Sequence, residues 1–370
     1  MGFDTRSNIQ NLLNNSSGIQ LHNDSSKSQI PFWASLIRDS DINAGFNEIQ
    51  GDEDFSRLEK LMILSIKDAL KNSDVEVTSP KTLILLSSAK GNIDLLEKTS
   101  GKPKENRVYL PGLGRVIQDF FKNPNTPLII SNGCISGVLS LITAFRLMQA
   151  GVYDNIIVTG GDIISEFTVS GFQSFKALSD GPCKPFDKNR NGLNLGEGVA
   201  TIILTANKGS AGKHKIQITG GATSNDANHI SGPSRTGDGL FISVNKTIKE
   251  GKENHIENID FISAHGTATV YNDEMESLAF TTAKLEDKPI NSLKGYFGHT
   301  LGAAGLIESV VSLQSLRDNV LFASKGFETI GVTGNLNVIE KTEKREMEVC
   351  LKTASGFGGC NAAILFKKNG

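Results

Sequence analysis

The stretch LIISNGCISGVLSLITAFRLM, residues 128–148, joins an apolar strand to an apolar helix through a turn that contains Cys134. Residues 128–130 form a short apolar run of the kind found in buried strands. From Cys134 to Met148 apolar side chains recur on nearly every side of a helix, and a helix of this kind is buried inside a protein. The stretch therefore predicts a strand–turn–helix elbow at the centre of an α/β fold.

The sequence on both sides continues the alternation of strands and helices. Residues 55–70 have the 3–4 spacing of an amphipathic helix, and residues 82–86, 156–158 and 201–204 are strand-like, whereas residues 97–110 are polar and predict a surface loop. This alternation predicts a largely parallel sheet that is covered on both faces.

The second half of the chain repeats this order. It contains two strand-like runs at residues 216–219 and 261–264, then a buried helix at residues 306–316, and then two more strand-like runs at residues 348–353 and 363–366. We therefore predict an α/β protein made of two duplicated βαβαβ halves, 1–206 and 207–370, which divide at a Lys/Gly/Ser loop near residues 207–212.

Composition excludes several classes of function. The 370 residues carry 38 Lys and Arg against 40 Asp and Glu, and this balance disfavours nucleic-acid binding or a polybasic membrane surface. No apolar run approaches the roughly 18 residues of a membrane span, and the start resembles neither a secretory signal nor a myristoylation site, so we expect a cytoplasmic protein. The four cysteines show no CxxC spacing, which disfavours a disulfide framework or a zinc site.

Cys134 is the candidate nucleophile. A thiol at the N-terminus of a helix lies near the positive end of the helix dipole and near unpaired amides, which stabilise a thiolate. Its flanking glycines, Gly133 and Gly137, would let a substrate carbonyl approach the backbone. The alternative is that Cys134 is a small core residue, as most buried cysteines are.

Two histidines follow predicted strands or precede helices. His265 begins HGTAT (265–269) and His299 lies in GHTLGAAG (298–305), and loops at the carboxyl ends of strands are where α/β sheets bind ligands. Neither histidine has a third metal ligand at short spacing, so a polar site is favoured over a metal site or simple loop packing. The other four are interpreted as surface residues: His22, His214, His229 and His255.

Three further motifs have a structural and a functional interpretation. Lys294 is either an ordinary solvated lysine or a residue that orients a catalytic group. The SGFGGCN stretch, residues 355–361, has more glycine than a β-turn needs, and its amides could form an oxyanion hole. The PFD and GEG motifs at residues 185–187 and 196–198 lack any Walker or Rossmann spacing and are interpreted as structural.

Taken in order, these motifs resemble the chain-elongating β-ketoacyl-acyl-carrier-protein synthases of the thiolase-like superfamily. The resemblance covers about residues 9–368. It rests on the Cys134 elbow and on four further motifs, which are GF…ALS…PFD…GEG (171–198), HGTAT with Asn272-Asp273, Lys294 with GHTLGAAG, and GFGG (356–359). It implies a thiolase-like fold with α-β-α-β-α layers.

The resemblance also implies roles for individual residues. Cys134 would take the acyl chain, His265 and His299 would act on the malonyl unit, and Lys294 would set the electrostatics of the site. The amides of Cys134 and Phe357 would form the oxyanion hole. Glu308 would support the helix after His299, and Phe357 would act as a gate. The hydroxyls of Thr267 and Thr269 would bind the pantetheine arm.

The same resemblance implies no cofactor and no metal, because the substrates are carried on the phosphopantetheine of an acyl carrier protein. That carrier protein is the expected partner, together with a second subunit in a homodimer or in a heterodimer with a chain-length-factor-like protein. Nucleic acid is not an expected partner. An inactive partner subunit of the chain-length-factor type is the alternative function, although such subunits lose the nucleophile.

The chain departs from the family pattern in three places. Family members open with a strand that Met1-Gly2 would follow, so we expect a strand to be missing from inside the first sheet. Residues 86–127 are shorter than usual, and this short form together with the NGCISG elbow favours a specialised role like that of the aryl polyene enzymes. Cys360 replaces a common threonine; a thiolase also has a second cysteine near its C-terminus, but it lacks the two histidine motifs in this form.

Overall fold

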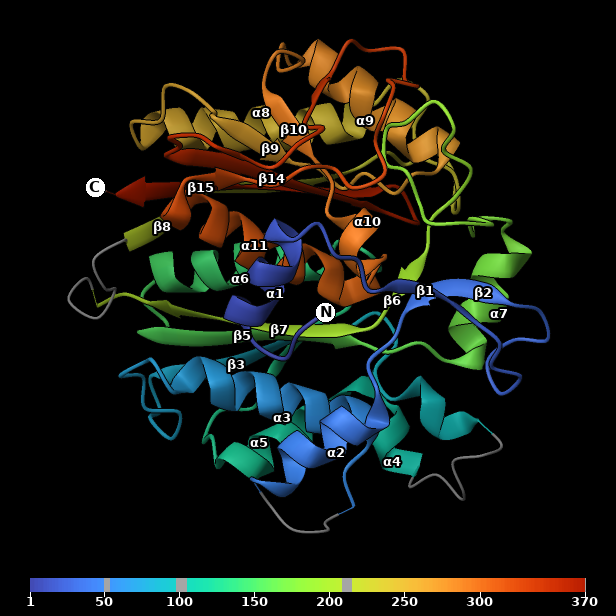
Figure 1. Cartoon of the computed structure of the whole chain (residues 1–370). Coiled ribbons are helices and arrows are strands. Elements are labelled where there is room, and N and C mark those ends of the chain that lie inside the picture. The colour runs from blue at the N-terminus through green and yellow to red at the C-terminus, as the bar shows by residue number, and fades with distance from the viewer. Residues whose placement is uncertain (50–53, 98–104, 208–214, 370) are drawn as a thin grey trace.

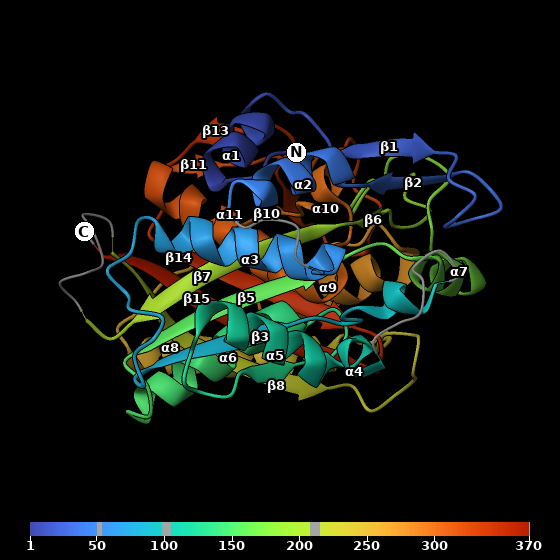
Figure 2. The same ribbon diagram turned by 90° about the horizontal axis from the view of Figure 1, so that it is seen from below.

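The computed structural model describes residues 1–49, 54–97, 105–207 and 215–369. These residues form five layers, which Figure 1 shows from top to bottom as helices, sheet, helices, sheet and helices. α8 and α9 cover the upper sheet, α6 and α11 lie between the two sheets, and α2, α3 and α5 cover the lower sheet; Figure 2 shows this lower layer face-on. The predicted layered α/β fold is confirmed.

The first half contains the lower sheet, its covering helices and a small hairpin. Its elements are α1 (Thr5–Leu13), β1 (Ile19–His22), β2 (Phe32–Ser35), α2 (Asp39–Asn47), α3 (Arg57–Leu70), β3 (Thr82–Ser87), η1 (Ile93–Leu96), α4 (Glu105–Val108), α5 (Leu110–Phe121), β4 (Leu128–Ile130), α6 (Ser136–Gln149), β5 (Asn155–Asp162), α7 (Glu166–Ser174), β6 (Leu195–Gly196) and β7 (Gly198–Thr205).

The second half contains the upper sheet. Its elements are β8 (Lys215–Asn225), α8 (Asp238–Glu253), β9 (Phe261–Ser263), α9 (Val270–Thr282), β10 (Pro289–Asn291), α10 (Lys294–Phe297), η2 (Leu301–Ala303), α11 (Ala304–Asp318), β11 (Val320–Leu321), β12 (Asn337–Val338), β13 (Glu343–Lys344), β14 (Val349–Gly356) and β15 (Cys360–Asn369).

The two main sheets share one topology. The lower sheet has the order β4-β3-β5-β7, and the upper sheet has the order β12-β10-β9-β14-β15-β8. Three neighbouring strands run parallel in the lower sheet and four in the upper sheet, and in each the next strand, β7 or β15, is antiparallel. The duplication predicted from the pattern of strands and helices is therefore present at the level of strand order.

Burial explains why these segments form their elements. All six residues of β3 are buried, as expected for a parallel strand with helices on both faces. α3 begins with a capping box between Ser56 and Glu59, and its apolar face buries Leu58, Leu61 and Met62 on the lower sheet. α6 is buried on several sides between the two sheets, as its sequence predicts.

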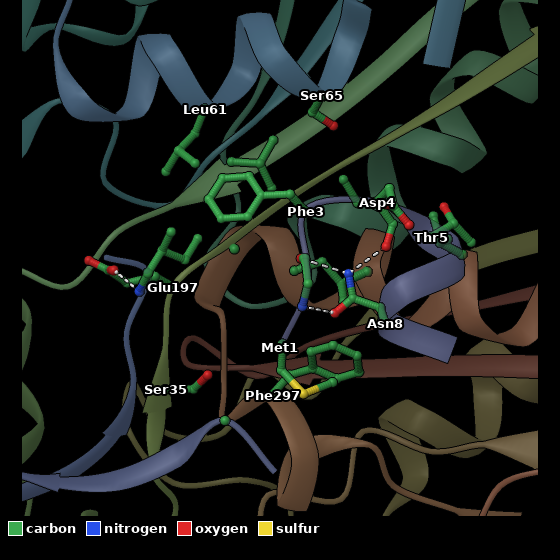
Figure 3. A pocket seen from close by; sticks show the side chains of 18 of the residues that line it. Met1, Phe3, Asp4, Thr5, Asn8, Ser35, Leu61, Ser65, Glu197 and Phe297 are labelled. Atoms are coloured by element: carbon green, nitrogen blue, oxygen red, sulfur yellow. Dashed lines mark hydrogen bonds between the residues drawn. The ribbon is translucent and has the colours of Figure 1, made fainter. Parts of the chain in front are cut away.

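The expected place of the missing strand is corrected by the structure. In the upper sheet β8 pairs antiparallel with β15 at the sheet edge, whereas among the described residues no strand pairs with the outer edge of β7. The vacant position is therefore at the edge of the lower sheet and not inside it. A cavity of about 460 Å³ lies beside this edge, and its lining includes Met1, Phe3, Leu61 and Phe297 (Figure 3).

Two other sequence-based expectations were wrong or fall outside the described residues. Residues 105–108 and 110–121 are helical, so only part of the 97–110 segment can be a loop, and residues 98–104 lie outside the described residues. His22 is not an ordinary surface residue, because its Nε2 lies 3.1 Å from the carbonyl oxygen of Ala34. His214 and most of the predicted division at residues 207–212 also lie outside the described residues, so the two-domain boundary stays a prediction.

Within the described ranges, no helix is both long enough and apolar enough to cross a bilayer.

Candidate active site

Cys134 lies in the turn between β4 and α6, two residues before the helix begins. The Ser136 hydroxyl accepts a hydrogen bond from the Asn132 amide (2.8 Å) and donates one to the Gly133 carbonyl (2.7 Å). Gly133 has φ 51°, a left-handed conformation that favours glycine. This hydrogen-bonded turn holds the thiol at the junction between the two halves.

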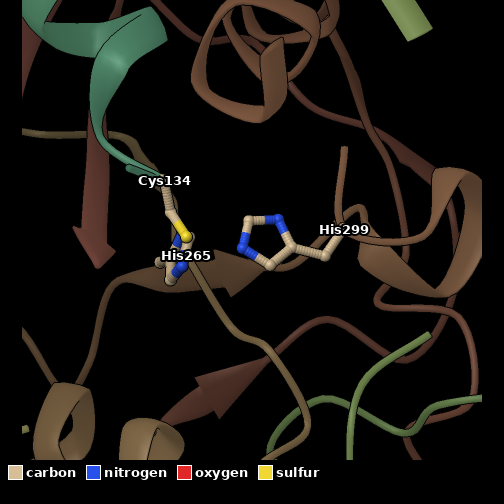
Figure 4. A group of neighbouring side chains, drawn as sticks. All are labelled: Cys134, His265 and His299. Atoms are coloured by element: carbon tan, nitrogen blue, oxygen red, sulfur yellow. The ribbon is translucent and has the colours of Figure 1, made fainter. Parts of the chain in front are cut away.

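The structure brings Cys134, His265 and His299 together. The Cys134 sulfur and one nitrogen of each imidazole all lie within 4.8 Å of one another, and Figure 4 shows the His299 ring pointing toward the other two side chains. The two rings meet edge to face, with centroids 5.2 Å apart. All three residues are buried, and the cysteine comes from the first half while both histidines come from the second.

Backbone contacts fix the position of His265. The amides of His265 and Gly266 donate to the two carboxylate oxygens of Glu276, at 2.8 and 2.6 Å. Gly266 has φ 37°, and a Cβ there would lie 2.5 Å from the Cβ of Ser292. Only glycine lets the chain turn this closely after the histidine.

His299 is held by its backbone and leaves one ring nitrogen free. Its amide donates to the Asn194 carbonyl (2.7 Å), and its carbonyl accepts from the Gly196 amide (3.0 Å). Its Nδ1 is buried and has no hydrogen-bond partner among the described residues. A buried imidazole nitrogen without a partner is available to a substrate group.

Lys294 is fully buried, so its interpretation as a solvated lysine was wrong. Its Nζ lies 2.7 Å from Glu308 Oε1, donates to the His265 carbonyl (2.6 Å) and lies 3.4 Å from His265 Nδ1. Because an ammonium only donates, His265 Nδ1 faces it as an acceptor and the ring proton belongs on Nε2. Glu308, expected to support its helix, ties α11 to Lys294 on α10.

The histidine pair is neutral near neutral pH. Burial, together with the positive charge of Lys294, holds the pKa of both His265 and His299 well below the usual value of about 6.5. Neutral imidazoles can donate a hydrogen bond from one nitrogen and accept a proton on the other.

The thiol of Cys134 does not follow the expectation from helix position alone. Burial raises its pKa to about 11, while the charge of Lys294 and the backbone N–H of Phe357 act in the opposite direction. The thiolate-stabilising effect expected at the start of α6 is therefore outweighed by desolvation. The resting residue is a thiol, and nucleophilic attack requires a base such as the neighbouring imidazoles.

The Gly356-Phe357 segment and the two predicted threonines lie next to this cluster along the chain or in space. The Gly356-Phe357 segment passes close to the elbow, because a Cβ on Gly356 would lie 3.2 Å from the Cys134 amide nitrogen. The Phe357 ring is 41% exposed and contacts Phe172 and Phe175 at ring-centroid distances of 5.8 and 5.3 Å.

Thr267 and Thr269 follow His265 in the loop before α9. Their hydroxyls are 2.9 Å apart, and the Thr267 amide donates to Asp273 (2.9 Å). The hydroxyls therefore form one polar pair, and their role in binding the pantetheine arm stays a prediction.

The motifs interpreted as structural make internal hydrogen bonds. Glu197 is buried and accepts from the amides of Ile37 (2.8 Å) and Ile164 (3.1 Å) and from Arg57 (2.7 Å). Asp187 accepts from three backbone amides, those of Asn189, Glu328 and Thr329.

Sequence reasoning missed two charged residues of the interior, Asp162 and Lys352. Asp162 accepts from Ser88 (2.8 Å) and from the Gly302 amide (2.7 Å), which ties the lower sheet to the segment after His299. Lys352 lies 2.7 Å from Glu308 Oε2. The available signal was a charged residue inside a strand of apolar neighbours, since such residues are rarely buried without a partner.

The fold also supplies the third metal donor that the sequence spacing lacked. Cysteine and histidine are zinc ligands, so the expectation that neither histidine has a third ligand nearby is wrong in three dimensions. However, the buried ammonium of Lys294 lies 3.4 Å from His265 Nδ1, and a second cation at this cluster would be repelled by it. The charges therefore favour an anionic or polar organic ligand.

Comparison with known proteins places this fold among those of the ketosynthases. A β-ketoacyl synthase from Burkholderia phymatum has a TM-score of 0.84 at 20% identity, with 98% of this chain and 95% of that chain covered. A ketosynthase from Xenorhabdus doucetiae, solved in complex with its chain length factor, has a TM-score of 0.82 at 22% identity, with 100% and 95% covered. These neighbours confirm the thiolase-like fold class.

Residues 3–209 match the N-terminal domain of the β-ketoacyl synthases and residues 216–328 match their C-terminal domain, so the chain belongs to this family of acyltransferases. A 3-oxoacyl-acyl-carrier-protein synthase 2 of Rhizobium meliloti is 27% identical over 335 residues, or 82% of this chain and 78% of that protein. A putative mitochondrial 3-oxoacyl-acyl-carrier-protein synthase of Schizosaccharomyces pombe is 31% identical over 258 residues, which are 64% of this chain and 60% of that protein.

Proposed function

We propose that the chain condenses an enzyme-bound acyl group with a malonyl thioester and releases carbon dioxide. The observation that carries this proposal is the buried cluster of one thiol and two neutral imidazoles, with the backbone N–H of Phe357 facing the sulfur. A nucleophile, a base and hydrogen-bond donors for an oxyanion are the groups that acyl transfer requires.

The first half-reaction loads Cys134. One of the two neutral imidazoles accepts the thiol proton, and the sulfur attacks the carbonyl of an acyl thioester. The amides of Cys134 and Phe357 stabilise the tetrahedral oxyanion, which collapses with loss of the carrier thiol. The products are acyl-Cys134 and a free carrier thiol that takes up the proton.

The second half-reaction forms the carbon–carbon bond. The malonyl thioester loses carbon dioxide, and the electron pair of the broken bond becomes an enolate whose oxygen accepts hydrogen bonds from His265 and His299. The enolate carbon then attacks the acyl-Cys134 carbonyl and expels the Cys134 sulfur, which gives a β-ketoacyl thioester. Two neutral hydrogen-bond donors stabilise this anion without forming an ion pair with it.

The partners follow from this chemistry. Substrates carried on the phosphopantetheine of an acyl carrier protein would reach Cys134 past Phe357, with Thr267 and Thr269 binding the pantetheine arm, and no other cofactor is needed. A second subunit, either a copy of this chain or a chain-length-factor-like protein, would complete the assembly. A specialised aryl-polyene-like pathway in the cytoplasm stays part of the proposal.

An inactive partner subunit is the alternative, and the site argues against it. Such a subunit has no use for a buried nucleophile beside two neutral imidazoles and a buried ion pair, because buried charges are costly unless they serve the fold or the chemistry. Cys134, His265, His299 and Lys294 are all in place.

Cys134→Ala tests the proposal. The substitution removes only the sulfur, so the protein should fold and should gain no acyl mass after incubation with acyl carrier protein thioesters. Intact-mass spectrometry of the parent and the variant measures this directly, and Cys360→Ala serves as the control because its sulfur lies outside the cluster. An acyl mass on the Cys134→Ala protein would show that another residue is the nucleophile.

A further inference from the structure

Lys352 is a second buried lysine beside the active site, and the reaction described above gives it no role. It lies in the middle of β14, and none of its side chain is exposed. A buried ammonium is strongly unfavourable unless oxygen atoms surround it. The groups around Lys352 therefore indicate what it does.

Three backbone carbonyls and one carboxylate surround its Nζ. It donates to the carbonyls of Ser263 (3.1 Å), Ala264 (3.2 Å) and Thr353 (2.7 Å), which uses its three protons. Glu308 Oε2 lies 2.7 Å from the same nitrogen as a charge contact that lacks hydrogen-bond geometry.

Lys352 and Lys294 together hold the strand end that carries His265. The carbonyls of three consecutive residues, 263 to 265, accept hydrogen bonds from the two ammonium groups, since Lys294 binds that of His265 at 2.6 Å. Glu276 binds the amides of His265 and Gly266 from the other side. The backbone of His265 is therefore fixed by cations at its carbonyls and by an anion at its amides.

The two lysines also place two positive charges close to the histidines. Both contact one carboxylate, that of Glu308, through its two oxygens. Two further ionisable groups lie beside the pair, Glu276 of α9 at the His265 amide and the Cys134 thiol. After burial, the charges of Lys294 and Lys352 lower the pKa of both histidines.

We propose that Lys352 is a second positioning lysine of the active site, which shares Glu308 with Lys294, holds the backbone that leads into His265 and places a second ammonium group behind the two imidazoles. This inference rests on the proposed condensation only for its catalytic consequence. Its electrostatic consequence can be measured without any substrate.

Two variants separate the charge of Lys352 from its hydrogen bonds. Lys352→Met removes both, whereas Lys352→Gln removes the charge and keeps an amide donor for the carbonyls. With ¹⁵N-labelled histidine, NMR titration of the full chain should show the His265 and His299 transitions moving to higher pH in both variants, by about half a pH unit or more. The rate of malonyl-acyl-carrier-protein decarboxylation at pH 7 should fall about 10- to 100-fold in Lys352→Met and less in Lys352→Gln.

The control is Lys368→Met. Lys368 also donates to a backbone carbonyl, that of Leu316 (2.8 Å), but it is not among the charged groups around the histidine pair. It should leave both titrations and the pH profile of decarboxylation unchanged.

The outcomes distinguish this inference from the proposed function. If the parent neither loads nor decarboxylates, the proposed function fails, while the NMR titration still tests Lys352. Unchanged histidine titrations in folded Lys352→Gln, or a rate loss that is equal at every pH, would overturn the inference and leave Lys352 as a structural residue. Failure of both variants to fold would overturn it in the same way.

Discussion

At the scale of single residues, the site separates acyl loading from condensation. Loading needs the Cys134 sulfur, a base and the backbone amides, whereas condensation also needs donors for the enolate oxygen. His265 is held by Lys294 and Glu276 through its own loop, but His299 has a free Nδ1 and no ion pair. The two histidines are therefore not equivalent, and removal of His299 should disturb the surrounding contacts least.

We expect His299→Ala to accumulate acyl-Cys134 and to form little β-ketoacyl product. The enolate would lose one hydrogen-bond donor, which by comparison with oxyanion-hole variants costs roughly 3 kcal/mol, or about 100-fold in rate. Intact mass after incubation with acyl thioester measures loading, and product analysis with malonyl thioester measures condensation. Turnover within about threefold of the parent would contradict an enolate role for His299.

The pH dependence of stability should reveal the neutral histidines. Their pKa is lowered in the folded state, so below about pH 6.5 the unfolded chain binds protons that the folded chain does not, and this contribution to stability falls as the pH falls. Each histidine contributes at most about 1.4 kcal/mol per pH unit. Glu276 and Asp162 act in the opposite direction, because burial raises their pKa to about 7 and about 6.

A comparison with His299→Asn isolates the histidine contribution from these carboxylates. The difference in unfolding free energy between parent and variant should change by about 1 kcal/mol between pH 6.5 and 5.5, in favour of the variant at lower pH. Urea unfolding at several pH values measures it. A difference that does not vary with pH would show that the pKa of His299 is the same in the folded and unfolded states.

The sequence identified the residues with a local signature and missed those defined by the fold. Cys134, His265 and His299 stand beside glycines at strand or helix ends, so their surroundings along the chain already mark them. Lys352 has no such mark, because its partners are carbonyls 88 and 89 residues earlier in the chain and a carboxylate on another helix. The raised pKa of Cys134 also depends on burial by segments remote in sequence, which the helix-dipole argument could not include.

At the scale of secondary-structure elements, the position of the elbow depends on how closely α6 and α11 approach. A Cβ on Gly137 would lie 2.6 Å from the amide nitrogen of Leu306, and a Cβ on Gly305 would lie 2.8 Å from that of Val138. The helices therefore cross with their backbones in contact at glycine. This crossing holds Cys134, just before α6, against His299, just before α11.

Gly137→Ala should destabilise the protein, because the new methyl group meets backbone and not a flexible side chain. Overpacking of this kind costs typically 1–3 kcal/mol, and separation of the two helices should also reduce acyl loading. The control is Gly171→Ala in α7, where a Cβ would meet nothing within 4 Å and where alanine should stabilise the helix by roughly 0.5–1 kcal/mol. Equal melting temperatures for the two variants would contradict the backbone contact.

Helices and strands were predicted best where apolar residues were dense. β4 has the predicted bounds, and α3 and α6 begin within two residues of them. The loop predicted at residues 97–110 was wrong at its end, because α4 occupies residues 105–108 and α5 starts at Leu110, with a proline in its first turn that indicates a helix start. The pairing of β7 could not be predicted, since strand order depends on contacts between segments distant in sequence.

At the scale of the whole molecule, the lower sheet has two edges without a neighbouring strand in the described parts of the chain. One is β7, beside the cavity that the N-terminal residues line, and the other is β4. β4 has three residues, with Leu128 38% exposed at its start. An unpaired strand edge with apolar side chains tends to pair with another chain.

We therefore expect the protein to assemble through the β4 edge, either with itself or with a chain-length-factor-like partner. Light scattering of the purified chain should give twice the protomer mass of 39.7 kDa, or reach the mass of a heterodimer when the partner is added. Leu128→Lys should weaken this assembly, because each copy would bring a charge into an apolar contact that must be desolvated. Val152→Lys is the matched control, since Val152 is similarly exposed but lies after α6 and outside both sheet edges. Equal dissociation of the two variants would place the interface elsewhere. An active monomer would exclude the assembly.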